Sequence, residues 1–440
     1  MYITGIHRYS KSIKQTKEKQ TRCVVTTCTH LNVIMLVVIP FLACYITWTI
    51  ANPINASVDC TISIQYKVGD LKEPQPLLLK RDGKRATIWY PNNDNGTLKI
   101  LAGDSIYLAC PGKDNYFKNR SWGNEVEAVC VEGKVFDVNG VHQYFSSLVC
   151  KSHTEHHAKY TVSPPCLGRH SHIEVGFNVS GVFIRTIELC RDEKTYTTYY
   201  TKFKMTKMIG SYQRKYPRPS KFLVGRFYPK VDIDNLYKFE TQLDTLARIL
   251  NSTELAKKRL KKSVQYLSRG HMVAKADFVY GAQQRSTFWY LNTAPQWQTF
   301  NGGNWNSLEM SVRHFAASRH LDLDVYTGVH GQMTMEDIHG KQQPIYLHAE
   351  AAVVSAPKFY WKVIYDPLSK QGTAFVGLND PFIRLITDDV YLCTDISEKI
   401  KWLNWRSRNI TSGISYACSV DDLRKAVPVV PLLDVIGILM

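Results

Sequence analysis

The stretch that decides the fold runs from residue 268 to residue 313 and reads SRGHMVAKADFVYGAQQRSTFWYLNTAPQWQTFNGGNWNSLEMSVR. It holds one histidine, His271. Asn301 follows 30 residues later, and Glu309 follows after another 8. Glu309 and Arg313 are four residues apart, so they share one face of any helix. This combination suits phosphodiester hydrolysis, because it offers a histidine base, a neutral oxygen ligand for a hard metal ion and cations that balance phosphate charge.

The same stretch carries short motifs in a fixed order. They are Arg269-Gly270-His271, Asn292-Thr293-Ala294-Pro295-Gln296, Phe300-Asn301-Gly302-Gly303-Asn304-Trp305, and then Glu309 and Arg313. Together they resemble the signature of the DNA/RNA non-specific endonuclease family, the His-Me finger nucleases, and look closest to the secreted insect double-stranded RNases. Tyr326-Thr327-Gly328 and Tyr360-Trp361-Lys362-Val363 also match. The resemblance covers about residues 237–381 and extends more loosely back to Cys60. Several ordered motifs at fitting spacing are a strong signal.

This resemblance implies an α+β fold: a ββα-metal core with a mixed sheet and flanking helices. His271 would lie on a strand as the general base that activates water. Asn301 would begin a helix and bind Mg²⁺, with Mn²⁺ as a substitute. The implied catalytic residues also include Arg269, Asn292, Glu309 and Arg313, and the products would carry 5′-phosphate ends.

The residues themselves fit these roles. Imidazole has an ordinary pKa of about 6.5, which suits a base. The amide oxygen of Asn301 is hard and neutral, as magnesium prefers. Without the family match, a lone histidine is more often structural, and an asparagine before Gly-Gly predicts a turn. Glu309 either accepts hydrogen bonds from water near the metal or pairs with Arg313, or does both. Gln296 is predicted to contact substrate or brace the site.

One position departs from the family. Many members carry an aspartate before Arg-Gly-His, and this chain has Ser268. If that residue only braces the turn, serine can replace it. If it tunes the histidine, the chain would be an inactive nucleic-acid-binding relative.

Positive charge predicts polyanionic partners. The formal net charge is +17, which favours nucleic acid or anionic membrane. Eleven lysines and arginines with interleaved tyrosines occupy residues 191–230, typical either of a nucleic-acid groove or of a solvated basic surface. A second run lies on a predicted helical region, residues 234–267, and there we expect Lys257, Lys258 and Arg259 to gather substrate phosphates.

An apolar run at residues 31–51 is long enough for one bilayer crossing. Basic residues precede it within residues 1–30, which places the N-terminus in the cytoplasm and the rest outside. The run is either an uncleaved signal anchor, which would make the membrane a partner, or a signal peptide cleaved after Ala51. The protein would be secreted, or a single-pass membrane protein with its enzymatic domain extracellular or lumenal.

The cysteines agree with export. Eight lie beyond residue 51, an even number that suits four disulfides of undetermined pairing. Six sequons, at Asn55, Asn95, Asn119, Asn178, Asn251 and Asn409, predict a glycoprotein. Short alternating strands and six of those cysteines predict a disulfide-rich β module over residues 52–190. An endonuclease domain would follow at residues 191–426, and then an apolar tail at residues 427–440.

The sequence thus predicts an extracytoplasmic, Mg-dependent, sugar-non-specific endonuclease that hydrolyses RNA, DNA or both, with double-stranded RNA among its substrates. Two alternatives come from other classes. One is a nuclease-like fold that has lost activity and only binds nucleic acid. The other is a cell-surface protein whose basic face binds anionic glycans or lipid.

Overall fold

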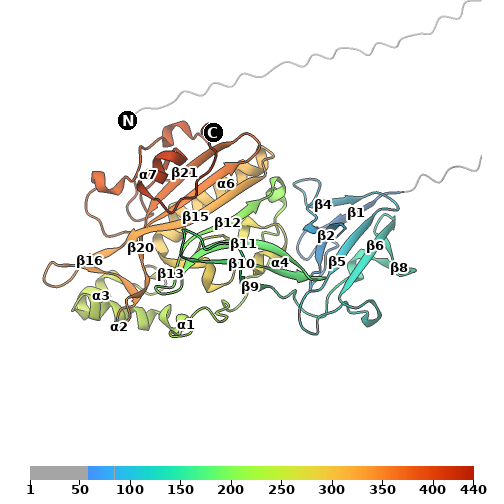
Figure 1. Cartoon of the computed structure of the whole chain (residues 1–440), viewed down its shortest axis with the longest axis horizontal. Helices are drawn as coiled ribbons and strands as arrows, with labels where there is room; N and C mark the ends of the chain where they lie inside the picture. Colours follow the sequence, from blue (N-terminus) through green and yellow to red (C-terminus); the bar gives the residue numbers. More distant parts are fainter. Residues whose placement is uncertain (1–57, 84) are drawn as a thin grey trace, which may run out of the picture. The chain divides into compact units, whose positions relative to one another are not determined.

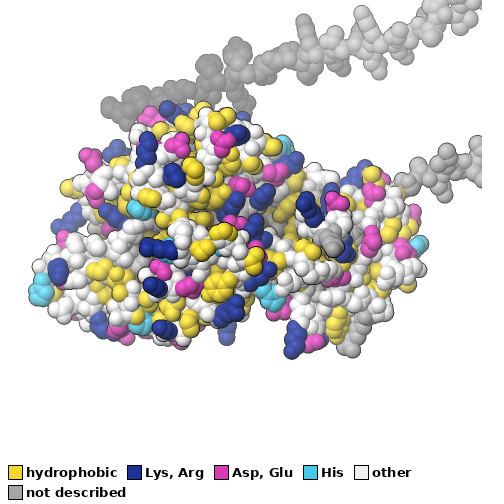
Figure 2. Space-filling model, viewed as in Figure 1, with side chains coloured by type: hydrophobic (Ala, Val, Ile, Leu, Met, Phe, Trp, Pro, Cys, Tyr) yellow, Lys and Arg dark blue, Asp and Glu magenta, His cyan; other side chains and the backbone are white. Residues whose placement is uncertain are grey.

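The computed structural model describes residues 58–83 and 85–440 (Figure 1). The predicted basic segment 1–30 and the signal or anchor segment 31–51 lie outside these residues. Among the described residues, no helix is long and apolar enough to cross a membrane. Charged side chains of both signs are spread over the surface that faces the viewer in Figure 2.

The leading part of the chain forms a β module, as predicted. Its strands alternate buried and exposed side chains, as in β6, so one face of the sheet packs on an apolar core. Disulfides Cys60–Cys130 and Cys110–Cys150 tie this module together. A pair of strands, β1 (Cys60–Ser63) and β4 (Thr97–Ile100), accompanies a six-stranded sheet in the order β3 (Arg85–Ile88), β2 (Leu77–Asp82), β5 (Ser105–Ala109), β6 (Glu125–Glu132), β7 (Val135–Val138) and β8 (Val141–Tyr144).

A larger antiparallel sheet of eight strands forms the rest of the framework (Figure 1). The domain boundary predicted between residues 190 and 191 falls inside its strand β11, which Cys166–Cys190 links to the turn before β10. Hydrogen bonding therefore continues across the predicted boundary. The strand order is β22 (Ser415–Cys418), β21 (Gln371–Leu378), β20 (Pro357–Asp366), β15 (Leu323–Gln332), β12 (Thr197–Met205), β11 (Val182–Asp192), β10 (Ser171–Val179) and β9 (His157–Tyr160).

The central strands of this sheet are buried on both faces, so they read as nearly continuous apolar runs. In β20, Tyr360 and Ile364 face the core that contains helix α6 (Asn306–Ser318). Trp361 and Val363 face a second core under helix α7 (Val420–Ala426). Lys362 alternates with them and lies on the α6 side, where its Nζ is 5.6 Å from the centre of the Trp305 ring.

The ββα unit lies on the α6 side. Strands β13 (Leu267–His271) and β14 (Thr293–Trp297) pair antiparallel, with His271 opposite Thr293 and Ser268 opposite Gln296. The chain between them forms helix α4 (Gly281–Arg285). After β14 come a short helix α5 (Gln298–Phe300), a π-helical turn at Asn301–Trp305 and α6. The α+β fold and the ββα order are as predicted. The predicted mixed sheet is wrong, because all neighbouring strands of the eight-stranded sheet pair antiparallel.

Helices cover part of the region predicted to be helical, residues 234–267. They are α1 (Ile233–Leu236), α2 (Phe239–Ile249) and α3 (Thr253–Arg259). Beyond Leu260 the helix prediction is wrong, because Lys261 and Gln265 pair as a tight turn that leads into β13. Two small hairpins follow β15, namely β16 (Thr334–Glu336) with β17 (Gln342–Pro344) and β18 (Tyr346–His348) with β19 (Val353–Ser355).

The fourth disulfide, Cys393–Cys418, holds the loop after β21 against β22. All eight cysteines beyond residue 51 are therefore paired, as the prediction of four disulfides requires. The apolar tail docks along the start of β21. Gln371 and Gly437 form a bridge, and the backbone N–H groups of Ile436 and Leu439 donate to the carbonyls of Lys370 and Gly372.

Candidate active site

His271 ends strand β13 and lies on its outer face with Arg269, away from Ser268 and Gly270. Its ring packs between Phe222 and Phe288, at centroid distances of 5.2 and 5.0 Å. The Nε2 atom is buried and has no hydrogen-bond partner. Burial lowers the pKa of His271 to about 4, because the apolar surroundings disfavour the imidazolium. The ring is therefore neutral at physiological pH and able to accept a proton.

A close approach explains the glycine before this histidine. A Cβ on Gly270 would lie 2.5 Å from Cβ of Gln296 and 2.9 Å from the hydroxyl oxygen of Tyr360. Tyr360 in turn donates to the carbonyl of Ala294 on β14. The hairpin thus lies tightly against β20, and only glycine fits.

Asn301 is held by a short chain of hydrogen bonds. The Ser268 hydroxyl donates to the carbonyl oxygen of Gln296 at 2.8 Å. That bond uses the only hydroxyl hydrogen, so towards Asn301 the same oxygen acts as an acceptor, and the Asn301 Nδ2 donates to it at 3.0 Å. The amide oxygen of Asn301 consequently points away from the serine and is free to bind a cation.

Glu309 lies two turns further on, at the centre of a charged cluster. Burial, together with the carboxylate of Asp277, raises the pKa of Glu309 to about 7 against the opposing charges of Lys362 and Arg313. Arg313 donates to Asp277 at 2.7 Å, and both side chains are buried. Among the described residues, no hydrogen bond or ion pair engages the Glu309 carboxylate directly, so it retains its full capacity to accept hydrogen bonds.

Arg269 and Asn292 are already engaged. Arg269 donates to the Tyr290 hydroxyl at 2.8 Å and to Asp234 at 3.0 Å, on the same face as His271. Its guanidinium lies 5.6 Å from the centre of the Phe222 ring. Asn292 is fully buried and bonds only to backbone: its amide donates to Val273 O and Thr287 O and accepts from Val273 N. Asn292 therefore fixes the chain just after His271 and does not face a substrate.

The structure brings some of the predicted residues together and separates others. Arg269 and His271 share one face of β13, and Glu309 and Arg313 share one cluster. Asn301 reaches the opposite face of β13, at the level of Ser268. Since strands rise about 3.3 Å per residue, Ser268 and His271 are roughly 10 Å apart along the strand. Among the described residues, no hydrogen bond or ring contact joins His271 to Asn301 directly.

Comparison with known proteins identifies the family of the chain. The family model described as DNA/RNA non-specific endonuclease matches residues 169–423, more than half of the chain. The chain belongs to the DNA/RNA non-specific endonuclease family. The matched residues 169–423, called the nuclease region below, contain the ββα unit and every strand of the eight-stranded sheet except β9. The protein is an endonuclease, a hydrolase of phosphodiester bonds.

Several relatives of this endonuclease come from insects. A "Salivary endonuclease" of Lutzomyia longipalpis is 29% identical over 84% of this chain and 83% of its own length. "Salivary protein Tsal2A" of Glossina morsitans morsitans is 26% identical over 84% of this chain and 92% of its own. A "Salivary endonuclease" of Culex quinquefasciatus is 24% identical over 84% and 90%.

The residues predicted to bind substrate outside the motifs have different surroundings in this endonuclease. Gln296 is fully buried beneath Gly270, and its amide atoms have no hydrogen-bond partner. Lys257 and Lys258 are exposed on α3. Arg259 lies over the ring of Phe382, 4.9 Å from its centre. Gln296 is thus placed to support the hairpin, and only the two lysines remain fully accessible to a polyanion.

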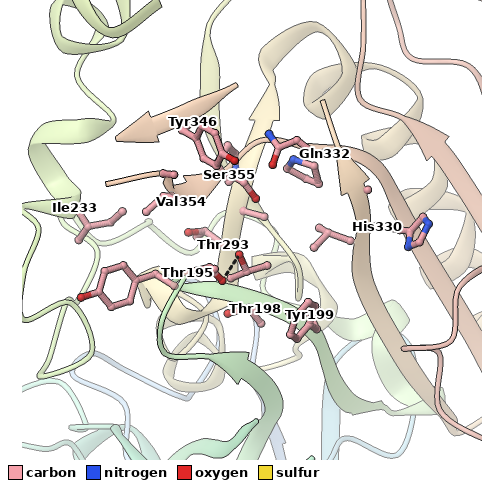
Figure 3. Close-up of a pocket in the computed structure, with 18 of the residues that line it drawn as sticks. Thr195, Thr198, Tyr199, Ile233, Thr293, His330, Gln332, Tyr346, Val354 and Ser355 are labelled. Carbon is pink, nitrogen blue, oxygen red and sulfur yellow. Dashed lines mark hydrogen bonds between the residues drawn. The ribbon is translucent and has the colours of Figure 1, made fainter. Parts of the chain in front are cut away.

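A cavity of about 290 Å³ lies beside the hairpin, on the β14 side (Figure 3). Thr293, the cross-strand partner of His271, contributes to its wall. Figure 3 shows Tyr346, Gln332 and Ser355 on one side of the view and Thr198 and Tyr199 on the other. No lysine, arginine or carboxylate lines this cavity, and His330 is its one histidine.

Three residues of the endonuclease site were not assigned a role from the sequence, namely Lys362, Asp277 and Phe222. Lys362 is buried, donates to the hydroxyl of Thr327 and faces Glu309. The sequence signal for Lys362 was a charged residue inside the apolar sequence of β20. Asp277 and Phe222 carried no signal, because each reaches the site only through a fold contact distant in sequence.

Proposed function

We propose that this protein is a Mg²⁺-dependent, sugar-non-specific endonuclease that cleaves RNA and DNA, with double-stranded RNA among its substrates. The observation that carries the proposal is the hydrogen-bonded chain from Gln296 through Ser268 to Asn301. It presents a neutral amide oxygen with no competing partner, the kind of ligand that magnesium accepts while keeping most of its waters. Serine thus supports the presentation of a metal ligand at the position where many relatives have aspartate.

In this proposal Asn301 holds the metal, with Mn²⁺ as a substitute, and bound Mg²⁺ supplies positive charge that stabilises the phosphate in the transition state. His271, neutral through burial, takes a proton from the attacking water. Glu309 accepts hydrogen bonds from water on the opposite side of the site. Arg313 and Lys362 keep the carboxylate of Glu309 poised between its charged and neutral forms.

Arg269 becomes a phosphate ligand in this proposal when substrate competes with Asp234, which is exposed and forms a surface ion pair. Such pairs are weak, commonly about 0–1 kcal/mol. A phosphate diester can therefore displace the carboxylate. Asn292 is a positioning residue, because it fixes the backbone that follows His271.

We also propose export and a revised domain division. Four disulfides are typical of an oxidising compartment, and the relatives are named as salivary proteins. The change from the six-stranded to the eight-stranded sheet falls between β8 and β9. A boundary near residue 155 therefore separates module from nuclease better than one at residue 190.

The proposal is tested by incubating the purified protein with plasmid DNA and with double-stranded RNA, with and without Mg²⁺. Cleavage of both substrates only in the presence of the metal supports it. Binding without cleavage would identify an inactive relative, and the absence of any interaction with nucleic acid would favour a different polyanion.

Removing the Ser268 hydroxyl tests how the metal ligand is positioned. In Ser268→Ala the amide of Asn301 loses its acceptor and is free to rotate. We expect the Mg²⁺ concentration for half-maximal activity to rise about 10- to 100-fold, the usual effect of losing a partner of a metal ligand. Ser268→Asp, which keeps an acceptor for the amide, should stay near the wild-type requirement. An unchanged Mg²⁺ requirement in the alanine variant would show that Ser268 does not position Asn301.

The pH dependence separates His271 from Glu309. His271 acts when neutral, so its contribution to activity is lost only as the pH falls through about 4. Glu309 accepts hydrogen bonds best when ionised, so its contribution rises as the pH increases through about 7. We therefore expect a rising limb near neutrality in the pH–rate profile, and Glu309→Gln should remove this limb while lowering the rate. A limb that persists in Glu309→Gln would assign it to another group.

A further inference from the structure

A groove of about 560 Å³ lies where the β module meets the nuclease region. One wall comes from the module, residues 65–68 and 94–95, and the other from residues 210–215, which follow β12. Three of its lining side chains, Lys67, Arg214 and Lys215, are cationic and exposed. Asp94 is the only carboxylate among its lining residues.

The two walls are joined by buried polar contacts. Gln213 is buried, and its side-chain amide donates to the carbonyl of Ile64 in the module at 2.6 Å. The amide oxygen of the same residue accepts from the backbone N–H of Gly281 at 2.6 Å. The rings of Tyr66 and Tyr216 meet edge to face at 5.1 Å. The two walls of the groove are therefore fixed to each other, because the side chain of Gln213 bonds to the β module at Ile64 and to the nuclease region at Gly281.

The cations of the groove are arranged around aromatic rings. Lys67 lies over Tyr66, 5.8 Å from the ring centre, and Arg214 lies over Tyr212 at 5.2 Å. Lys215 has no hydrogen bond or ion pair among the described residues. Lys67 and Arg214 are therefore partly oriented, and all three charges are accessible to solvent, which suits contact with a flexible polyanion.

The groove reaches the candidate active site through Tyr212. The Arg313 guanidinium lies 5.9 Å from the centre of the Tyr212 ring, and Arg313 is one helical turn beyond Glu309 on α6. Lys275, four residues after His271, donates to the carbonyl of Tyr216 behind the same wall. Tyr212 thus lies in the lining of the groove and also next to Arg313 of the charged cluster around Glu309.

We propose that this groove binds the phosphodiester backbone of the nucleic acid on one side of the cleaved bond, so that the β module is part of the substrate-binding surface. The inference rests on the proposed function and extends it, because it assigns a substrate contact to residues outside the nuclease region. Lysine and arginine side chains that contact phosphates neutralise their charge whatever the base sequence.

The test compares two triple variants that remove the same charge. The groove variant is Lys67→Gln, Arg214→Gln and Lys215→Gln. The control is Lys113→Gln, Lys401→Gln and Arg408→Gln, three exposed cations that also comprise one in the module and two in the nuclease region. Asn95 is a predicted glycosylation site among the residues that line the groove, so every protein compared also carries Asn95→Gln.

Binding of a labelled 30-base-pair duplex is measured against salt in EDTA, on a His271→Ala background. The groove variant should flatten the log–log salt slope by about 1–3 and weaken binding about 10- to 100-fold at 0.15 M salt. Lys67→Gln alone should flatten the slope by about 0.9. Equal slopes for the groove and control variants would overturn the proposal.

Two further measurements exclude trivial explanations. Asp94→Asn removes the carboxylate of the groove and should tighten binding, a gain that partial unfolding cannot produce. With His271 restored and Mg²⁺ present, the groove variant should raise KM for duplex while kcat stays within about twofold, and a large fall in kcat would also overturn the proposal. Failure of the proposed function is distinguishable, because an inactive protein would still show the groove-dependent salt slope.

Discussion

His271→Ala is expected to lower the rate of phosphodiester cleavage by about 10²- to 10⁴-fold, the usual loss when a general base is removed. The reason is local: the ring is neutral, its Nε2 has no protein partner, and no other side chain on the outer face of β13 can take a proton at neutral pH. The rate should be measured under single-turnover conditions with saturating Mg²⁺, so that substrate capture and product release do not contribute.

The matched control is His330→Ala. His330 is also half-buried, and burial also lowers its pKa, but it lines the uncharged cavity beside the hairpin (Figure 3). This variant should cleave at close to the wild-type rate. Thermal unfolding of both variants checks that loss of the contacts with Phe222 and Phe288 has not disrupted the hairpin. A folded His271→Ala protein with near wild-type turnover would show that His271 is not the base.

Removing the metal or its ligand is expected to have an effect of similar size. EDTA should abolish cleavage, and added Mg²⁺ should restore it, because the amide oxygen of Asn301 has no hydrogen-bond partner among the described residues and is the proposed metal ligand. Asn301→Ala should lose most activity and require much more Mg²⁺. Asn306→Ala, at an exposed asparagine at the start of α6, is the control and should behave like wild type. Full cleavage in EDTA would reject the proposed mechanism.

Much of the fold was accessible from sequence because its signals are local. Short alternating strands predicted the leading β module, and an even number of cysteines beyond residue 51 predicted four disulfides. The resemblance to the nuclease family implied that His271 lies on a strand and that Asn301 begins a helix. In the structure His271 ends β13, and Asn301 begins the π-helical turn before α6. The pairing of the cysteines and the end of the helical region at Leu260 needed the three-dimensional fold.

The site itself was only partly accessible. That Ser268 is the acceptor for Asn301 depends on a bond between residues 33 positions apart. The pKa of Glu309 depends on burial and on Asp277 and Lys362, which come from the 3-10 helix Lys275–Asp277 and from β20. The apolar pocket that depresses the pKa of His271 depends on Phe222, from a segment predicted only as basic. Each effect arises from packing between distant segments, which no short motif encodes.

Arg269 illustrates the opposite case. Its motif predicts a phosphate contact, and in the structure the guanidinium is already paired with Asp234 and the Tyr290 hydroxyl. The sequence identifies the positive charge of Arg269 but not its partner Asp234, which substrate would have to displace. The same holds for Gln296, whose motif predicts a role at the site while the fold buries it under Gly270.

The most direct test of the central claim is cleavage of matched DNA and RNA duplexes in H₂¹⁸O with Mg²⁺, followed by mass analysis of the new ends. Activation of water by His271 predicts that both duplexes are cut and that ¹⁸O appears in the 5′-phosphate of each product. Uncut DNA together with RNA products ending in 2′,3′-cyclic phosphate would contradict the account, because the ribose hydroxyl and not water would then be the nucleophile.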